Sequence, residues 1–134
     1  MDTPEDWWRR VEDKRAVAAR FKDDRKHAGE AWHASGSAVE FALKACILRR
    51  EGWNRWPDRS HRPDLYVHDL GRLFAIAQIS HEALPAELRA SLRMVLSWRR
   101  EHEYNGDRVP RRVARQMFEA AFGPDGVIEW LKRS

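Results

Sequence analysis

The sequence contains one cysteine, Cys46, so no disulfide bond can form within the chain. A single thiol suits a protein of a reducing compartment. The chain also lacks a long apolar run, since its most apolar stretch, "FALKACIL", is interrupted by Lys44 and is far too short to span a bilayer. The first residues, "MDTPEDWW", are acidic where a secretory signal peptide is basic and then apolar. We therefore expect a cytoplasmic protein that does not enter a membrane.

Alternation between polar and apolar residues is also absent beyond a few positions, so the sequence predicts no β-sheet. Apolar residues instead recur at helical spacing through the 134 residues. A chain of this length can bury a core without disulfides or a structural metal. We expect one all-α domain over residues 1–134, an antiparallel up-and-down helical bundle of four main helices plus short extra helices.

Capping and helix-breaking residues divide the chain into these helices. The expected boundaries are, in order, Pro4 for the first helix, Asp23-Asp24 and Gly52 for the long second helix, His68-Asp69 for the third, Pro85 for the fourth, Pro110 and Gly123-Pro124 for the fifth, with a short last helix around Ile128. Residues 52–67 contain two prolines and are expected to form a loop. Small residues in the first half of the second helix, such as Gly29 and Gly36, predict that a neighbour packs closely there.

Lysine is missing from residues 89–115, although this stretch has eight arginines against three acids, a net charge of +5. The rest of the chain has 17 basic and 18 acidic residues, a net charge of −1. Arginine presents a planar fork of donors that fits phosphate oxygens and stays charged at any working pH. This arginine-rich stretch is therefore either a solvated basic face or a surface that binds phosphate groups.

The middle of the stretch reads "SWRREHEYNGDRVPRR". Leu88, Leu92 and Val95 form the apolar stripe of the fourth helix, and Arg99 and His102 continue it at the same spacing, which predicts that both face a cleft or a subunit interface. There, histidine can transfer a proton near neutral pH, and arginine can stabilise the charge that develops on a phosphate. The alternative is a plain helix end, because positive residues are favoured in the last turn of any helix.

Several segments taken together resemble a HEPN domain (higher eukaryotes and prokaryotes nucleotide-binding). They are the long helix "AWHASGSAVEFALKACILRREG", the helix start "HDLGRLF", the helix end rich in Arg, His and Tyr, and the final "VIEWLKR". Glu40 with Lys44, and His68 with Asp69, carry the resemblance best. It covers the chain from about Ala28 to the C-terminus and implies a helical bundle that usually dimerises and acts on a nucleotide or RNA. Many members accompany a small nucleotidyltransferase or an antitoxin.

The active ribonucleases of that family share a motif of an arginine, a polar residue and a histidine four to six residues after the arginine. Two protomers bring these residues together in one cleft. Here only two residues separate Arg99 from His102, although His102-Glu103-Tyr104 matches the usual His-x-Tyr ending. We therefore expect binding rather than cleavage of a nucleotide or RNA, through Arg99, Arg100, His102 and Tyr104, with Arg108, Arg111 and Arg112 widening the surface.

Two alternatives stay open. One is a metal-independent ribonuclease toxin, with Arg99 and His102 as catalytic residues at a dimer cleft. The other is a structural module whose basic surface docks an acidic protein. We expect no cofactor, and no metal site, because His33, Cys46, His61 and His68 show no ligand spacing.

Other polar and aromatic residues allow more than one interpretation. Glu40 and Lys44 have the favourable order for a helix ion pair, which lies either at the surface or in the groove of the bundle. His68 and Asp69 are expected to cap the third helix, with His68 at or near the cap and Asp69 in the first turn. Trp53 and Trp56 either stack on bases or fold over the end of the bundle. The remaining tryptophans expected to anchor the core or an interface are Trp7, Trp32, Trp98 and Trp130.

Overall fold

The computed structural model describes residues 2–98 and 109–133, and every structural statement below refers to these residues. In this part the chain is all-α and contains no strand, so the expectation of an all-α chain is confirmed. The helices are α1 (Pro4–Phe21), α2 (Ala28–Glu51), α3 (Leu70–Ile76), α4 (Ala86–Leu96), α5 (Arg111–Phe122) and α6 (Val127–Arg133), with short 3-10 turns at Pro63–Leu65 and His81–Ala83. None of these helices combines the length and the apolar character needed to cross a membrane.

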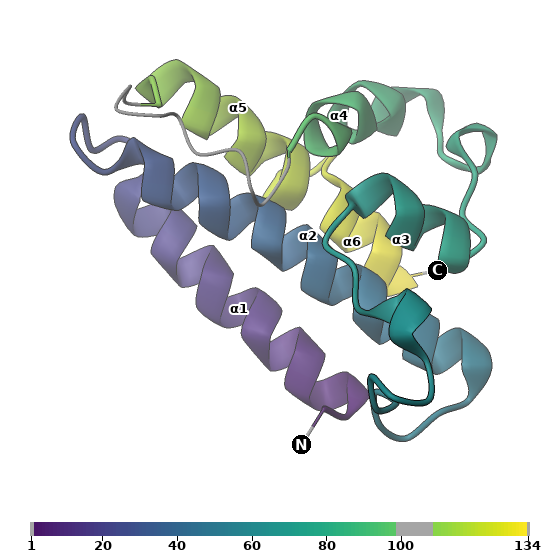
Figure 1. Ribbon diagram of the computed structural model, residues 1–134. Coiled ribbons are helices and arrows are strands. Elements are labelled where there is room, and N and C mark those ends of the chain that lie inside the picture. Colours follow the sequence, from purple (N-terminus) through teal and green to yellow (C-terminus); the bar gives the residue numbers. More distant parts are fainter. Residues whose placement is uncertain (1, 99–108, 134) are drawn as a thin grey trace.

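The central element is α2, which is buried on nearly every side between Ala28 and Leu48. A helix that is apolar all round has to be covered by neighbours. α1 runs antiparallel to α2 along most of its length, and α3, α5 and α6 also pack against α2 (Figure 1). Groups that α1, α5 or the loop before α3 bring to the core therefore meet on α2.

Most helix boundaries lie where local signals predict them. Gly52 ends α2 with a φ of 69°, a left-handed conformation that glycine adopts without a steric penalty. Pro110 directly precedes α5, and Gly123 directly follows it. At α3 the prediction was one residue off: Asp69 is the N-cap rather than a first-turn residue, and its carboxylate accepts a hydrogen bond from the Arg72 backbone N–H at 3.2 Å.

The start of α2 differs from the prediction. Asp23-Asp24 was expected to cap this helix, but α2 begins at Ala28, with His27 in the cap position. The Asp24 carboxylate instead accepts hydrogen bonds from the backbone N–H groups of Lys26 and His27, at 2.8 and 3.0 Å. An aspartate that bonds to the backbone two and three residues ahead stabilises a turn, and this delays the helix.

The fourth helix ends at Leu96, with Ser97 as its C-cap. Leu88, Leu92 and Val95 are buried, as their spacing predicted. The expected continuation of this stripe through Arg99 and His102 lies outside the described residues.

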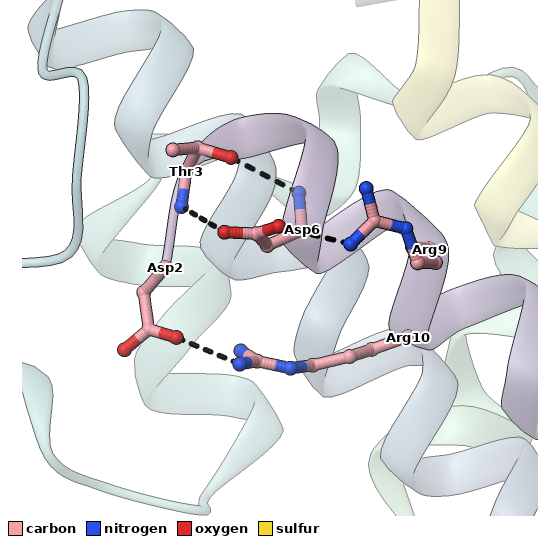
Figure 2. Close-up of polar contacts among 5 residues, drawn as sticks. All are labelled: Asp2, Thr3, Asp6, Arg9 and Arg10. Carbon is pink, nitrogen blue, oxygen red and sulfur yellow. Dashed lines mark hydrogen bonds and ion pairs between the residues drawn. The ribbon is translucent and has the colours of Figure 1, made fainter.

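A reciprocal pair of hydrogen bonds closes the first turn of α1 (Figure 2). The Thr3 hydroxyl accepts from the Asp6 backbone N–H at 3.2 Å, and the Asp6 carboxylate accepts from the Thr3 backbone N–H at 3.1 Å. The bond from the Thr3 N–H holds the pKa of Asp6 well below its usual range, because it stabilises the charged carboxylate.

We expect Asp6→Ala to lower the free energy of unfolding at pH 7 and to have less effect in acid. The pKa of Asp6 is lower in the folded than in the unfolded chain, so this carboxylate stabilises the fold fully above its ordinary pKa of about 4. The contribution is lost as the pH falls below that value. Urea unfolding at pH 7 and at steps below pH 4 measures it, with Glu5→Ala as control for an exposed carboxylate of the same turn. A difference from wild type that does not change with pH would contradict the prediction.

Candidate functional site

The structure describes residues 89–98 and 109–115 of the arginine-rich stretch. Arg111 and Arg112 form the first turn of α5 and are exposed. The other predicted binding or catalytic residues of this stretch lie outside the described part of the chain, and their roles stay predictions: Arg99, Arg100, His102, Tyr104 and Arg108.

Arg111 and Arg112 lie at the end of α5 where helix stability disfavours cations. The N-terminus of a helix carries a partial positive charge, so acidic residues are favoured there. α5 has no acid in its first turn, and its cap residue, Pro110, offers the backbone N–H groups no side-chain acceptor. Backbone and guanidinium groups therefore create positive potential in one place, which suits an anionic ligand.

Arg115 lies one turn further along α5 and donates a hydrogen bond to Asp23 at 3.1 Å. Asp23 also accepts a hydrogen bond from Lys22. The bond from Lys22 and, to a smaller extent, the bond from Arg115 lower the pKa of Asp23 because they stabilise its charged carboxylate. The Arg115 and Asp23 side chains are 52% and 56% exposed, and ion pairs this open contribute little to stability. Arg115 therefore stays accessible to a competing anion.

A groove between α4 and α5 begins beside Arg115. Its volume is about 510 Å³, within the range of small-molecule sites. Ala90, Met94 and Ala120 give it apolar walls, and its polar lining residues, besides Arg115, are Ser91, Gln116, Glu119 and Asp125. The apolar walls of this groove can accept a flat ring, and Arg115 at its rim can hold an attached phosphate.

Trp98 and Val109, which flank residues 99–108 of the arginine-rich stretch, both pack on α2. The Trp98 side chain is 1% exposed and lies so close to Gly36 that a Cβ at this glycine would overlap the indole ring. Val109 lies over Gly29, 3.5 Å from where a Cβ would be. The two glycines lie about two turns, or about 10 Å, apart along the helix. Neighbours thus pack closely on these small residues of α2, although the neighbours at Gly36 and Gly29 are Trp98 and Val109, which lie outside the helices.

A second polar group lies further along α2, where Glu40, Lys44 and His68 meet; we call it the Lys44–Glu40–His68 cluster. Lys44 Nζ donates to Glu40 Oε2 at 3.2 Å, and the two residues are 6% and 1% exposed. His68 Nδ1 lies 3.2 Å from both carboxylate oxygens of Glu40. The His68 side chain is 51% exposed. The cluster therefore connects a buried ion pair to an imidazole that solvent can reach.

Aromatic rings surround the Lys44 ammonium. Its Nζ lies 5.0 Å from the Trp7 ring centroid and 5.5 Å from that of Trp56, within the range of cation–π attraction. The two indoles contact each other edge to face, with their centroids 5.8 Å apart. Trp56 is buried in this contact, so of the two interpretations of the loop tryptophans, the one in which they fold over the end of the molecule holds for Trp56.

The N-terminal residues hold these rings in place. The Asp2 carbonyl oxygen accepts a hydrogen bond from the Trp56 backbone N–H at 2.8 Å. The Asp2 carboxylate pairs with Arg10 at 2.7 Å (Figure 2), and the Arg10 guanidinium lies 4.3 Å from the Trp7 ring centroid. The environment of Lys44 is therefore built from α1, α2 and the loop, and it is firmly held.

Trp98 and the cluster contact the same side of α2. Gly36, Glu40 and Lys44 follow one another at intervals of four residues, which places them on neighbouring turns of the same helix side. Trp98, which packs on Gly36, thus lies about 6 Å along the helix from the turn that carries Glu40.

Of the four residues that carry the HEPN resemblance best, and that were expected to support the site, Glu40, Lys44 and His68 come together, while the Asp69 carboxylate caps α3. Sequence reasoning missed Trp7 and Trp56 as neighbours of Lys44. Their only signal was the number of tryptophans, seven in 134 residues, which does not say where each ring lies.

Metal and thiol chemistry gain no support from the described residues. In residues 2–98 and 109–133 no three His, Cys, Asp or Glu side chains are grouped to hold a metal ion. The Cys46 thiol is buried, donates to the Leu131 carbonyl oxygen at 3.4 Å, and has a pKa raised by burial. A thiol with a raised pKa is a poor nucleophile.

No protein-family model matches the chain, and neither a curated protein nor a solved structure matches it with significant similarity. The indications of function therefore come from the chemistry of the residues themselves. They offer an exposed cationic helix end, a groove beside it, and a buried ion pair that holds an accessible imidazole.

Proposed function

We propose that this chain is a HEPN-type helical module that binds a nucleotide or RNA through its arginine-rich stretch. The observation that carries the proposal is the exposed pair Arg111 and Arg112 in the first turn of α5, where helix stability favours acids instead. An anionic partner explains arginines placed against the helix dipole. Phosphate is the anion that the planar arginine fork fits best.

In this proposal Arg111, Arg112 and Arg115 contact phosphate oxygens, and the groove between α4 and α5 accepts a base or a sugar. The packing of Trp98 and Val109 on α2 supports a site on this side of the molecule. The residues that complete this surface are Arg99, Arg100, His102, Tyr104 and Arg108.

The proposal includes the finer features that the HEPN resemblance implies. The helices form an antiparallel up-and-down bundle of four main helices, and two copies associate with their fourth helices at or near the interface. A nucleotidyltransferase or an antitoxin is the partner protein, as in a toxin–antitoxin pair. The order of the polar groups along the chain supports the HEPN resemblance, because Glu40 and Lys44 lie on the long helix α2 and His68-Asp69 lies at the start of α3.

We expect Arg111→Glu and Arg112→Glu to weaken RNA binding while stabilising the fold. Each removes a charge-assisted hydrogen bond to phosphate, worth about 1.5–3 kcal/mol, or about ten- to a hundredfold in Kd. Each also places an acid at the N-terminus of α5, which raises the free energy of unfolding by about 0.5 kcal/mol. Fluorescence anisotropy with a labelled single-stranded RNA at several salt concentrations measures the first effect, and urea denaturation the second.

Arg50→Glu is the matched control, because Arg50 is an exposed arginine in the last turn of α2, outside the stretch. We expect it to leave RNA affinity unchanged and to lower stability, since an acid is unfavourable at the C-terminal end of a helix. An equal loss of affinity in the Arg50 and α5 variants would indicate diffuse attraction by net charge and contradict a site at α5.

Incubation of the same RNA in EDTA separates binding from cleavage. Intact RNA is the result expected of a binding module. Cleavage that Arg99→Ala and His102→Ala both abolish would instead establish the metal-independent ribonuclease, with Arg99 holding the phosphate and His102 transferring the proton. Failure to bind RNA, together with capture of an acidic protein that RNA does not displace, would favour the structural module.

A further inference from the structure

We infer that His68 contacts the bound RNA and accepts a hydrogen bond from a ribose 2′-hydroxyl, with Glu40 and Lys44 as its positioning residues. The inference rests on the proposed function and makes it more specific, since it selects RNA over DNA. The contacts within the Lys44–Glu40–His68 cluster carry it, together with the place of the cluster on α2.

The Glu40 carboxylate determines which nitrogen of His68 can meet a ligand. Nδ1 of His68 lies 3.2 Å from both carboxylate oxygens, and a carboxylate only accepts hydrogen bonds. Nδ1 therefore carries the hydrogen, and in the neutral ring Nε2 is left as an acceptor on the far edge. A phosphate also offers only acceptors, whereas a ribose 2′-hydroxyl offers a donor. Within the sugar–phosphate backbone, the 2′-hydroxyl is therefore the group that this imidazole complements, and it is the group that DNA lacks.

A purely structural role does not account for the cluster. A buried ion pair adds little to stability compared with apolar residues of the same size. Here each group holds the next: Trp7 and Trp56 enclose the Lys44 ammonium, Lys44 donates to Glu40, and Glu40 accepts from His68. Lys44 and Glu40, at the inner end of this series, are almost completely buried, whereas the His68 side chain at its outer end is 51% exposed. Such a series of contacts fixes the orientation of one accessible group.

The cluster lies on the side of α2 on which Trp98 and Val109 pack. Glu40 lies one turn of α2 from Gly36, the contact of Trp98. Val109, two residues before Arg111, packs on Gly29, about 16 Å along α2 from Glu40. An RNA strand of several nucleotides whose phosphates bind Arg111 and Arg112 can therefore place a ribose at His68.

The test compares RNA with DNA of the same base sequence in binding to the full chain, with His68→Asn as the variant. Asparagine keeps an amide N–H close to the place of Nδ1, where it can still donate to Glu40, and removes the acceptor at Nε2. We expect the wild type to bind RNA more tightly than DNA. We expect His68→Asn to weaken RNA binding about three- to tenfold, as for the loss of one neutral hydrogen bond, and to leave DNA binding unchanged. His61→Asn, in a loop histidine whose side chain is 79% exposed, is the matched control and should change neither affinity.

Imidazole ¹⁵N spectra give a second readout that a structural role would not move. We expect the His68 Nε2 signal to shift on addition of RNA and to stay in place on addition of DNA. Glu40→Gln should reduce the preference for RNA, because an amide both donates and accepts and no longer selects one tautomer of His68.

The outcomes separate this inference from the proposed function. Equal binding of RNA and DNA by the wild type, or RNA binding that His68→Asn does not weaken, overturns the role of His68 while the site at α5 stands. Failure of the wild type to bind either nucleic acid overturns the proposed function and this inference with it.

Discussion

Gly36→Ala is expected to destabilise the protein by about 2 kcal/mol or more, the upper part of the usual range for overpacking. Alanine normally stabilises a helix relative to glycine, so the expected loss of stability is opposite to what helix propensity predicts. The cause is Trp98, whose ring a Cβ at position 36 would overlap. At 1% exposure this ring cannot move aside without leaving the core. Urea denaturation of the variant and the wild type measures the difference.

Two comparisons identify the contact as the cause. Gly29→Ala makes the same change in the same helix, but its Cβ would meet only Val109, at 3.5 Å, an ordinary contact distance. We expect it to be neutral or to stabilise the protein by up to about 1 kcal/mol. In a Trp98→Leu background, the cost of Gly36→Ala should largely disappear, which a double-mutant cycle detects. An equal cost in both backgrounds would mean that the helix backbone, and not the ring, rejects a side chain at position 36.

The same variant connects packing to the proposed site. Trp98 is the last described residue before Arg99, so a displaced ring shifts the position from which the predicted binding residues follow. RNA affinity should therefore fall in Gly36→Ala, and the fall should be absent when Gly36→Ala is introduced into Trp98→Leu, where no ring is displaced. That result would connect the packing of the core to RNA binding.

Most of the fold could be predicted because helix ends depend on residues close together in the chain. Thr3, Gly52 and Pro110 each mark a boundary through their own backbone preference or one short-range hydrogen bond. Asp24 shows where such reasoning fails. The same carboxylate can cap a helix or close a turn, and the composition of the segment does not decide between the two.

The candidate site could be predicted only in part, because its contacts join distant residues. The spacing of Glu40 and Lys44 revealed a possible ion pair, but its burial depends on Trp7 and Trp56, which come from α1 and the loop. The bond from His68 to Glu40 spans 28 residues, and no helical period connects them. Periodicity describes one helix at a time, whereas the site is formed between helices.

Removal of either charge of the buried ion pair is expected to destabilise the protein much more than removal of both. Lys44→Met takes away the ammonium beside the Glu40 carboxylate, and Glu40→Leu leaves the Lys44 ammonium between Trp7 and Trp56 without that carboxylate. Breaking a buried pair in this way costs about 3–5 kcal/mol. The double variant Glu40→Leu/Lys44→Met buries no charge and keeps a similar volume, so it should return to within about 1–2 kcal/mol of the wild type. Urea denaturation of the four proteins gives the coupling energy.

In that double variant, stability and RNA recognition are expected to separate. The fold is restored, but His68 has lost the carboxylate that orients it. We expect DNA affinity, which depends on Arg111 and Arg112, to stay at the wild-type value, and RNA affinity to fall about three- to tenfold, as in His68→Asn. If the cluster served only to hold the fold, the double variant would bind RNA as the wild type does. A protein that is stable but no longer distinguishes RNA from DNA would assign Glu40 and Lys44 to the positioning of His68.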